Sequence, residues 1–165
     1  MQALYTVRFK RRRKCKTNYK KRLALLKSRL PRLVARKSNR FFYAQFVTFG
    51  AKGDETLAAA CSRELAKMGF PGKCNTPSAY LTGLLAGKRA LKKGIKKFVL
   101  DTGLHSATKG SVLFAALKGA VDAGLATNAS EEILPKPERI EGKHLSEEVQ
   151  KSFVEAKQKI LSLNA

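Results

Sequence analysis

The chain has 165 residues, and its 34 Lys plus Arg outnumber its 12 Asp plus Glu, which gives a formal net charge of +22. A hydrophobic fraction of 44% is ordinary for a globular protein and excludes a wholly disordered or fibrous chain. No apolar run approaches the ~18 residues of a membrane-spanning helix, and the cluster Leu23 to Leu26 is too short for a signal-peptide core. We therefore expect a soluble, unexported protein without a membrane partner.

The positive charge is concentrated at the start of the chain. Residues 1–40 hold 16 basic residues and no acid, residues 41–118 hold 12 against 4, and residues 119–165 hold 6 against 8. Solubility requires a net charge of only ~2 to 8 in a small domain. The excess therefore predicts a polyanionic partner, and nucleic acid is the commonest one.

Residues 1–30 are predicted to form a basic arm followed by a helix. The first 16 residues have no apolar period, so we expect them to stay extended until a partner orders them. Thr17 is a plausible N-cap, and Pro31 ends the helix. Its apolar stripe has helical spacing: Tyr19, Leu23, Leu26 and Leu30.

Residues 31–125 are predicted to form an α/β core domain. The runs 32–37 and 41–49 are rich in β-branched and aromatic residues and are separated by Ser38-Asn39, which predicts a hairpin. The second run is apolar on both faces, which predicts a central strand covered on both sides. In residues 56–68 the pattern leaves two alternatives open, a helix or a strand over Leu57 to Cys61 followed by a helical turn from Ser62.

Two helices and a strand complete this core. Thr76 is the expected N-cap of a helix over Pro77 to Lys93, stopped by Gly94, and its small residues Gly83, Gly87 and Ala90 suit close packing. A buried strand is expected over 97–101, and Ser111 should cap a helix that ends at Gly124. The order of elements predicts a three-layer α/β fold.

Residues 126–165 are predicted to form an irregular tail and a docking helix. The segment 126–144 contains prolines and lacks a period, and Ser146 caps the final helix. One narrow apolar stripe suits this helix to docking on the domain or on a neighbouring protein: Val149, Phe153, Ala156, Ile160 and Leu163.

Sequence motifs do not support an enzyme, a metal site or a cofactor. Asp101-Thr102-Gly103 resembles an aspartic-protease triplet, but helices flank it. A strand that ends in a turn is the simpler interpretation, with Asp101 either capping the turn or holding a basic neighbour. Residues 83–89 lack the spacing and the Ser or Thr of a P-loop. The cysteines Cys15, Cys61 and Cys74 include no C-x-x-C pair, so we expect three reduced thiols, no metal and no small-molecule substrate.

What remains is nucleic-acid binding through five dispersed basic segments, an arrangement that suits folded RNA. They are the arm (Arg8, Lys10, Arg11, Arg12, Arg13, Lys14 and Lys16), the helix with Tyr19 and Arg22, the turn Arg36, Lys37, Ser38, Asn39 and Arg40, the helix end from Lys88 and Arg89 to Lys97, and the loop from His105 through Lys109 and Gly110. Tyr5, Phe9 and Tyr19 could stack on unpaired bases, although packing on the domain explains them equally well.

Four long motifs, in order, resemble the archaeal and eukaryotic branch of the ribosomal protein eighteen family of the large subunit. They are RRRKCKTNYKKRLALLKS (11–28), PRLVARKSNR (31–40), NTPSAYLTGLLAGKRALKKG (75–94) and VLDTGLHSATKGSVLFAALKGAVDAG (99–124). The similarity covers about residues 5 to 145. It implies a three-layer fold like that of ribonuclease H, used without catalysis, with residues 57–61 as a strand.

The resemblance also implies a function. The protein is expected to hold 5S rRNA in the central protuberance of the large subunit, beside 23S rRNA and neighbouring ribosomal proteins. The arm, Tyr19, Arg22, the Arg36 to Arg40 turn and the loop from His105 to Ser111 would contact RNA. Residues 13–16 depart from the family, which often has an acid and a glycine there, and the short helix after Ser146 leaves its partner open.

Two other functions fit the residues less well. A protein that compacts nucleic acid without regard to sequence would show no preference for folded RNA. A metal-dependent nuclease on the same fold would need clustered carboxylates, whereas the 12 acids here are widely spread.

Overall fold

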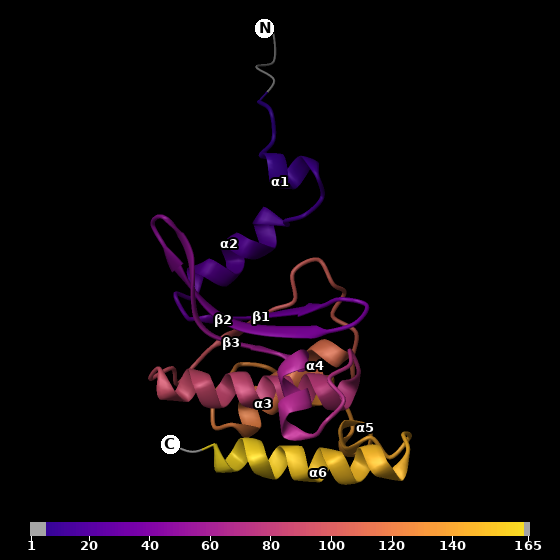
Figure 1. Cartoon of the computed structure of the whole chain (residues 1–165). Helices are drawn as coiled ribbons and strands as arrows, with labels where there is room; N and C mark the ends of the chain where they lie inside the picture. Colours follow the sequence, from indigo (N-terminus) through magenta and orange to yellow (C-terminus); the bar gives the residue numbers. More distant parts are fainter. Residues whose placement is uncertain (1–5, 164–165) are drawn as a thin grey trace, which may run out of the picture.

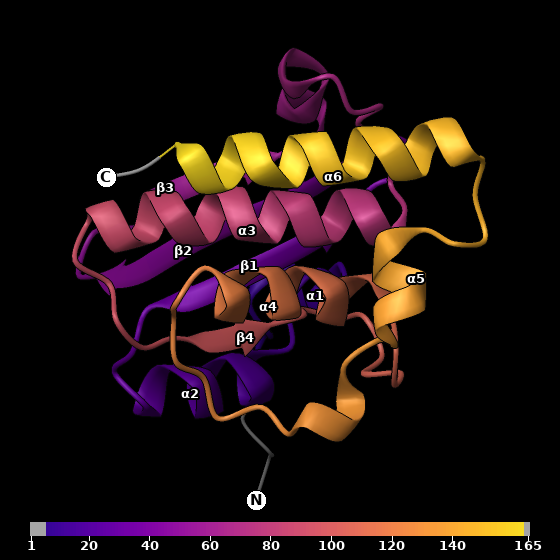
Figure 2. The ribbon, with the colours of Figure 1, turned by 90° about the horizontal axis from the view of Figure 1, so that it is seen from below.

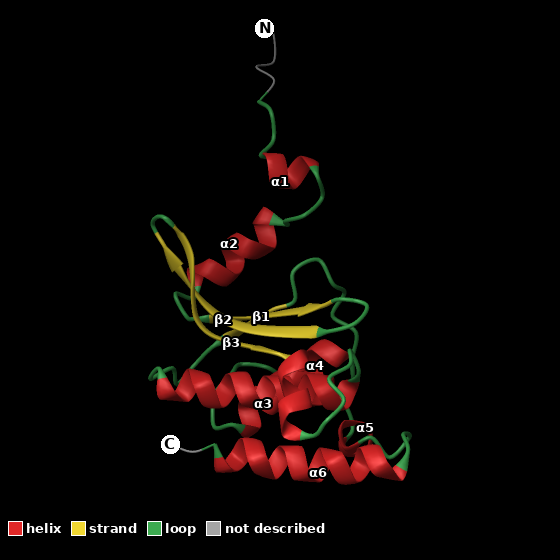
Figure 3. Ribbon diagram, viewed as in Figure 1, coloured by secondary structure: helices red, strands yellow, loops and turns green. Residues whose placement is uncertain are grey.

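The computed structural model describes residues 6–163 as a four-stranded sheet with helices on both faces (Figures 1 and 3). The strands are β1 (Arg32–Lys37), β2 (Phe42–Gly50), β3 (Gly53–Cys61) and β4 (Val99–Asp101). The α-helices are α1 (Lys10–Arg13), α2 (Tyr19–Lys27), α3 (Thr76–Lys92), α4 (Val112–Asp122), α5 (Pro137–Glu141) and α6 (Glu147–Ser162), and the 3-10 helices are η1 (Ser62–Met68) and η2 (Glu131–Ile133).

The sheet has the strand order β3-β2-β1-β4. β2 is antiparallel to both β1 and β3, whereas β4 returns parallel to β1 after the α3 crossover. In Figure 1, α2 lies on one face of the sheet, α3 and α4 cover the opposite face, and α6 lies on the outer side of α3. The predicted three-layer α/β architecture is therefore confirmed.

The predicted strands are present with small shifts. β1 has the predicted bounds, β2 begins and ends one residue later, and residues 57–61 belong to a strand, as the resemblance implied. β4 is shorter than the predicted 97–101, because Lys97 leaves β1 and forms an isolated parallel bridge with Ala126. Cys15, Cys61 and Cys74 are free thiols, as expected.

One face of β2 is less covered than the sequence predicted. Phe42, Ala44 and Phe46 are fully buried against the helices, but on the other face Tyr43 is 41% exposed and Phe49 is 61% exposed. The prediction of a strand covered on both sides is wrong at these two residues, because the short helix α2 spans only part of that face (Figure 1).

The cap residues of two helices differ from the predictions. Asn18, not Thr17, caps α2 by accepting from the Lys21 N–H, and Asn75, not Thr76, caps α3 by accepting from the Ser78 N–H. Ser111 does occupy the cap position of α4, but its side chain makes no cap hydrogen bond. Thr and Asn are both good N-cap residues, and at the start of α2 and of α3 the Asn side chain makes the cap hydrogen bond.

The two segments predicted to be irregular contain short helices. The arm is not fully extended, since Lys10–Arg13 form one helical turn, held by the contact between the Phe9 and Tyr19 rings. Tyr5 lies outside the described residues. The tail likewise contains η2 and α5, the latter begun by Pro137 and ended by Gly142 at φ +78°.

The final helix α6 docks on the domain itself. Phe153, Ala156 and Ile160 are buried in the same apolar cluster as α3, and the Phe153 ring lies 5.9 Å from that of Tyr80. α3 is consequently enclosed by the sheet on one side and α6 on the other (Figure 2). The predicted stripe is confirmed at these three residues, whereas Leu163 is 47% exposed beyond the end of the helix.

The predicted close approach at the small residues of α3 is confirmed. A Cβ on Gly83 would collide with the Ala116 carbonyl of α4, and a Cβ on Gly87 would lie 2.7 Å from that of Ala123. The two helices therefore pack backbone against backbone. This contact outweighs the ~1 kcal/mol that each interior glycine costs a helix.

We predict that Gly83→Ala lowers the free energy of unfolding by about 2 kcal/mol, because overpacking outweighs the gain in helix propensity. Urea unfolding measures the change, and Lys92→Ala at the exposed end of the same helix serves as the control, with a change within about 0.5 kcal/mol. A Gly83→Ala protein as stable as the parent would contradict the close contact.

Candidate nucleic-acid interface

A cleft of about 510 Å³ lies between the start of α2 and the loop that follows β4. Its lining includes Arg11 and Lys16 from the arm, Arg22 from α2, Arg36 from β1 and His105 from the loop. Parts of four of the five predicted basic segments thus meet around one hollow, although they are widely separated in the sequence. The arrangement can receive a polyanion from several sides at once.

The arm makes few contacts with the rest of the molecule. The Phe9 and Tyr19 ring centroids are 5.2 Å apart, and the Arg11 Nε–H donates to the Thr17 hydroxyl over 2.8 Å. Within residues 6–163, the other charged arm residues are exposed and form no ion pair: Arg8, Lys10, Arg12, Arg13, Lys14 and Lys16. Their charges are available to phosphate.

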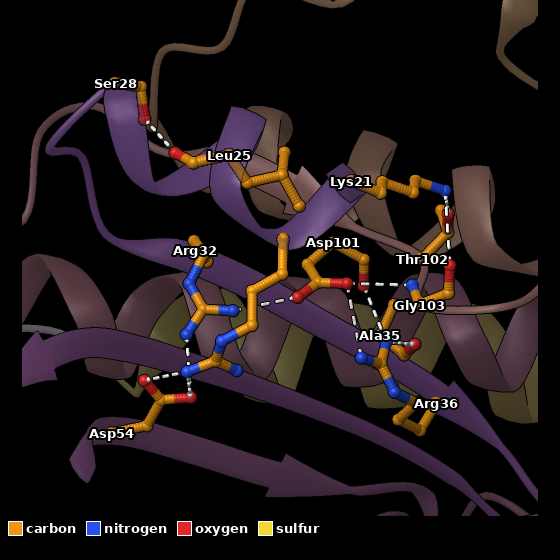
Figure 4. Close-up of polar contacts among 11 residues, drawn as sticks. Lys21, Leu25, Ser28, Arg32, Ala35, Arg36, Asp54, Asp101, Thr102 and Gly103 are labelled. Atoms are coloured by element: carbon orange, nitrogen blue, oxygen red, sulfur yellow. Dashed lines mark hydrogen bonds and ion pairs between the residues drawn. The ribbon is translucent and has the colours of Figure 1, made fainter. Parts of the chain in front are cut away.

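A buried arginine organises the floor beneath α2 (Figure 4). Arg32, on the central strand β1, is only 2% exposed, and its guanidinium lies 2.8 Å from Asp54 of β3 and 2.9 Å from Asp101 of β4. Burying a charge is tolerated only when it is paired. The two carboxylates therefore neutralise Arg32 and connect it to both edge strands.

The same two acids hold the arginines that border the cleft. Asp54 accepts two hydrogen bonds from Arg22 at 2.8 and 2.9 Å. Asp101 accepts from Arg36 over 3.2 Å, and its backbone carbonyl accepts from the same guanidinium over 2.7 Å. The expectation that Asp101 holds a basic neighbour is confirmed. Arg22 and Arg36 remain 32% and 40% exposed as side chains, so each presents an edge to solvent while it is fixed from below.

The pKa of Asp54 reflects this setting. Burial alone would raise the pKa of the carboxyl, but the hydrogen bonds and charges of Arg32 and Arg22 outweigh that effect and hold it below its ordinary value. The ionised form is therefore the stable one in the folded protein.

Polar contacts, rather than a buried apolar stripe, attach α2 to the sheet. The Lys21 ammonium donates to the Thr102 hydroxyl over 2.8 Å and to the Gly103 carbonyl over 3.3 Å (Figure 4). The predicted stripe is wrong at Leu23, which is 59% exposed, and Leu25 lines the cleft instead. α2 contains no buried residue.

The turn after β1 lies beside the loop after β4. The Ser38 hydroxyl accepts from the Phe41 N–H over 2.9 Å and donates to its carbonyl over 2.8 Å, which leaves Asn39 and Arg40 exposed at the tip. Lys37, Ser38 and His105 line one small cavity. Burial and the charges of Lys37 and Arg36 lower the pKa of His105, so its imidazole sits in a positive field.

The segment from Lys88 is not part of this surface around the cleft. Arg89 donates to the Ala59 carbonyl of the edge strand β3 and to Glu64 of η1 over 2.6 Å. Burial raises the pKa of Glu64, but Arg89 and the Cys61 N–H together lower it by more, so the pKa lies below its ordinary value. Arg89 thus protects a sheet edge, and Lys88 beside it is half-buried.

Three residues that shape this surface were not among the predicted RNA contacts: Lys21, Arg32 and Asp54. A charged residue opening an apolar strand, as Arg32 does, signals either an exposed edge or a buried pair. The chain alone does not reveal its partner Asp54, because the pairing of β2 with β3 shifts register between Phe46 and Val47, where β3 has one extra residue, Leu57. Within residues 6–163, no group of three His, Cys, Asp or Glu could hold a metal, and no helix is long and apolar enough to span a membrane.

Comparisons with known proteins identify relatives that match most of the chain. Residues 3–98 match the family model described as ribosomal large subunit proteins 60S L5 and 50S L18. The chain is also similar to the large ribosomal subunit protein uL18 of Korarchaeum cryptofilum (strain OPF8). The two are 54% identical over 143 residues, which is 86% of this chain and 73% of that protein.

We predict that Asp101→Asn lowers the free energy of unfolding by about 3 kcal/mol, because it leaves the buried Arg32 with one carboxylate. Chemical denaturation measures the change. Glu132→Gln is the matched control, since its contact with Lys109 is long, at 3.9 Å, and exposed; it should change stability by less than about 0.5 kcal/mol. Equal effects of the two substitutions would refute a structural role for Asp101.

We also predict a loss of stability in acid. The pKa values of Asp54 and Glu64 are lower in the folded protein than their ordinary values of 3.8 and 4.5, so the unfolded chain binds more protons as the pH falls. Their contribution is present above about pH 5 and disappears as the pH falls through the folded-state values. Unfolding curves from about pH 6 to pH 3 should show a shallower decline for Asp54→Asn; an unchanged slope would contradict the assignment.

Proposed function

We propose that this chain, which belongs to the family of ribosomal large subunit proteins 60S L5 and 50S L18, binds 5S rRNA and attaches it to 23S rRNA in the central protuberance. Family membership makes the chain a structural protein of the large ribosomal subunit in the cytoplasm, and not an enzyme. The choice of 5S rRNA rests on the four sequence motifs given above and on the shape of the basic surface.

The observation that carries the proposal is the cleft bordered by Arg11, Lys16, Arg22 and Arg36. A straight duplex groove would favour one row of cations, whereas a hollow surrounded by several elements fits a folded RNA that is bound by its shape. The exposed arm extends this surface away from the sheet (Figure 1). Tyr19, whose ring contacts Phe9, would stack on an unpaired base beside this surface.

The opposite side of the molecule suits protein partners. α6 carries three acidic and three basic residues and lies across the domain from the arm (Figure 1). The outer face of α6 exposes Val154 and Leu161, which are 53% and 37% accessible. We therefore place neighbouring ribosomal proteins on this side and RNA on the side of the arm.

We predict that Arg12→Ala combined with Arg13→Ala lowers affinity for every RNA by roughly tenfold and reduces the slope of log K against log salt by about 1.5. These two arginines are chosen because Arg11 is engaged with Thr17. Filter binding of 5S rRNA and of tRNA over a salt series from about 50 to 300 mM measures both quantities.

The control removes the same charge from the other side, by Lys67→Ala combined with Lys151→Ala, both exposed. It should leave the slope unchanged. Wild-type protein should prefer 5S rRNA to tRNA. Equal affinity for the two RNAs would overturn the proposal in favour of unspecific compaction, and an unchanged slope in the arm variant would show that the arm does not contact phosphate.

A further inference from the structure

The helices α3 and α4 begin at the same end of the molecule. They run parallel, because Gly83 packs on Ala116 and, one turn later, Gly87 packs on Ala120 and Ala123. In Figure 2 both helices start beside α5. Each helix N-terminus carries the equivalent of roughly half a positive charge, so two such ends reinforce each other here.

A cavity of about 220 Å³ lies where these helices begin. It is lined by Thr76 of α3, by Ser111 and Val112 of α4, and by the cationic side chains of Lys37 and Arg139. His105 is also part of the lining, and no Asp or Glu is. The space is large enough for one small anion and water.

The first turn of α4 leaves hydrogen-bond donors without partners. The Val112 and Leu113 N–H groups precede the first intrahelical bonds, which begin with Phe114 and Ala115 donating to the Ser111 carbonyl. The Ser111 side chain makes no cap hydrogen bond. Its hydroxyl oxygen is buried to less than 1 Å² and has no partner among residues 6–163. A buried polar atom of this kind normally has a partner.

The charges around the cavity are equally uncompensated. Lys37 and Arg139 form no ion pair with any acid of the described chain. At the cavity wall, burial and, to a smaller extent, the charges of Lys37 and Arg36 lower the pKa of His105. Free N–H donors, an unsatisfied hydroxyl and two unpaired cations all match the needs of a tetrahedral oxyanion.

We propose that this cavity binds a phosphate group through the Val112 and Leu113 N–H groups, the Ser111 hydroxyl, Lys37 and Arg139, and that the rRNA backbone supplies it. The identity of the RNA rests on the proposed function, whereas the phosphate site does not. Arg139 was absent from the sequence-based set of RNA contacts. Its place in the site follows from α5, which brings it to the beginning of α4.

The site itself is tested on the free protein. Titration with inorganic phosphate, and separately with dimethyl phosphate as a model of the RNA diester, should shift the amide resonances of Val112 and Leu113. The shifts should saturate, and they should vanish in Arg139→Ala. Sodium chloride at equal ionic strength is the control. An absence of saturable shifts with both phosphates would overturn the site.

The source of the phosphate is tested with RNA. Val112→Pro removes one N–H donor at the first helical position, where proline is well tolerated, and the extended backbone of Ser111 (φ −72°, ψ 162°) is compatible with it. It should lower affinity for 5S rRNA by roughly tenfold without changing the salt slope, since no charge is lost. Arg139→Ala should lower the affinity and also the slope, by about 0.7 to 0.9.

Glu147→Pro is the matched control, because it places proline at the same position of α6 after a similar cap (Ser146, φ −60°, ψ 152°). It should bind RNA as well as wild type. If Val112→Pro also binds 5S rRNA normally while phosphate shifts the amides, the RNA backbone is not the source. If wild-type protein shows no preference for 5S rRNA, the proposed function fails and the amide shifts still decide the phosphate site.

Discussion

The surface that we propose as the RNA interface depends on one buried ion-pair system, in which Arg32 lies between Asp54 and Asp101. Arg32 sits on a central strand, and its two partners sit on the two edge strands, so the guanidinium ties the sheet together across its width. Each carboxylate then reaches outward to a second arginine, Arg22 or Arg36. Two acids, Asp54 and Asp101, thus fix the arginines around the cleft, although the net charge of the chain is strongly positive.

The use of acids in this chain follows from that arrangement. Residues 41–118 contain only four acids, and three of them, Asp54, Glu64 and Asp101, each hold an arginine in place. The remaining cations of the arm have no such partner and are anchored by one aromatic contact and one hydrogen bond. The surface therefore has a fixed part around the cleft and a weakly held part in the arm, whose conformation a bound RNA can set at small cost.

Local sequence signals predicted most of the fold. Composition and the Ser38-Asn39 turn identified β1 and β2. The ends of α3 and α4 were predicted from cap residues, Pro77 and the glycines that follow each helix, because these features act within a few residues. Tyr43 and Phe49 were misjudged because alternation shows which residues share a face and not what covers it. The unbroken cationic run of the arm was visible in the sequence, whereas the pairing of Arg32 with Asp54 depends on strand register, which a single chain does not state.

The end of β1 explains how one short segment can serve both the cleft and the cavity at α4. Successive side chains of a strand point to opposite faces, so Arg36 borders the cleft while Lys37, the next residue, lines the cavity. His105 contributes to both linings and lies between them. Arg36 and Lys37 lie close enough to repel each other, and Asp101 offsets part of the charge of Arg36. Anions in the two hollows would relieve the repulsion that remains. An RNA backbone that passes over this strand end would neutralise both sides at once, which couples binding in the cleft to binding at the helix ends through charge rather than through a change of shape.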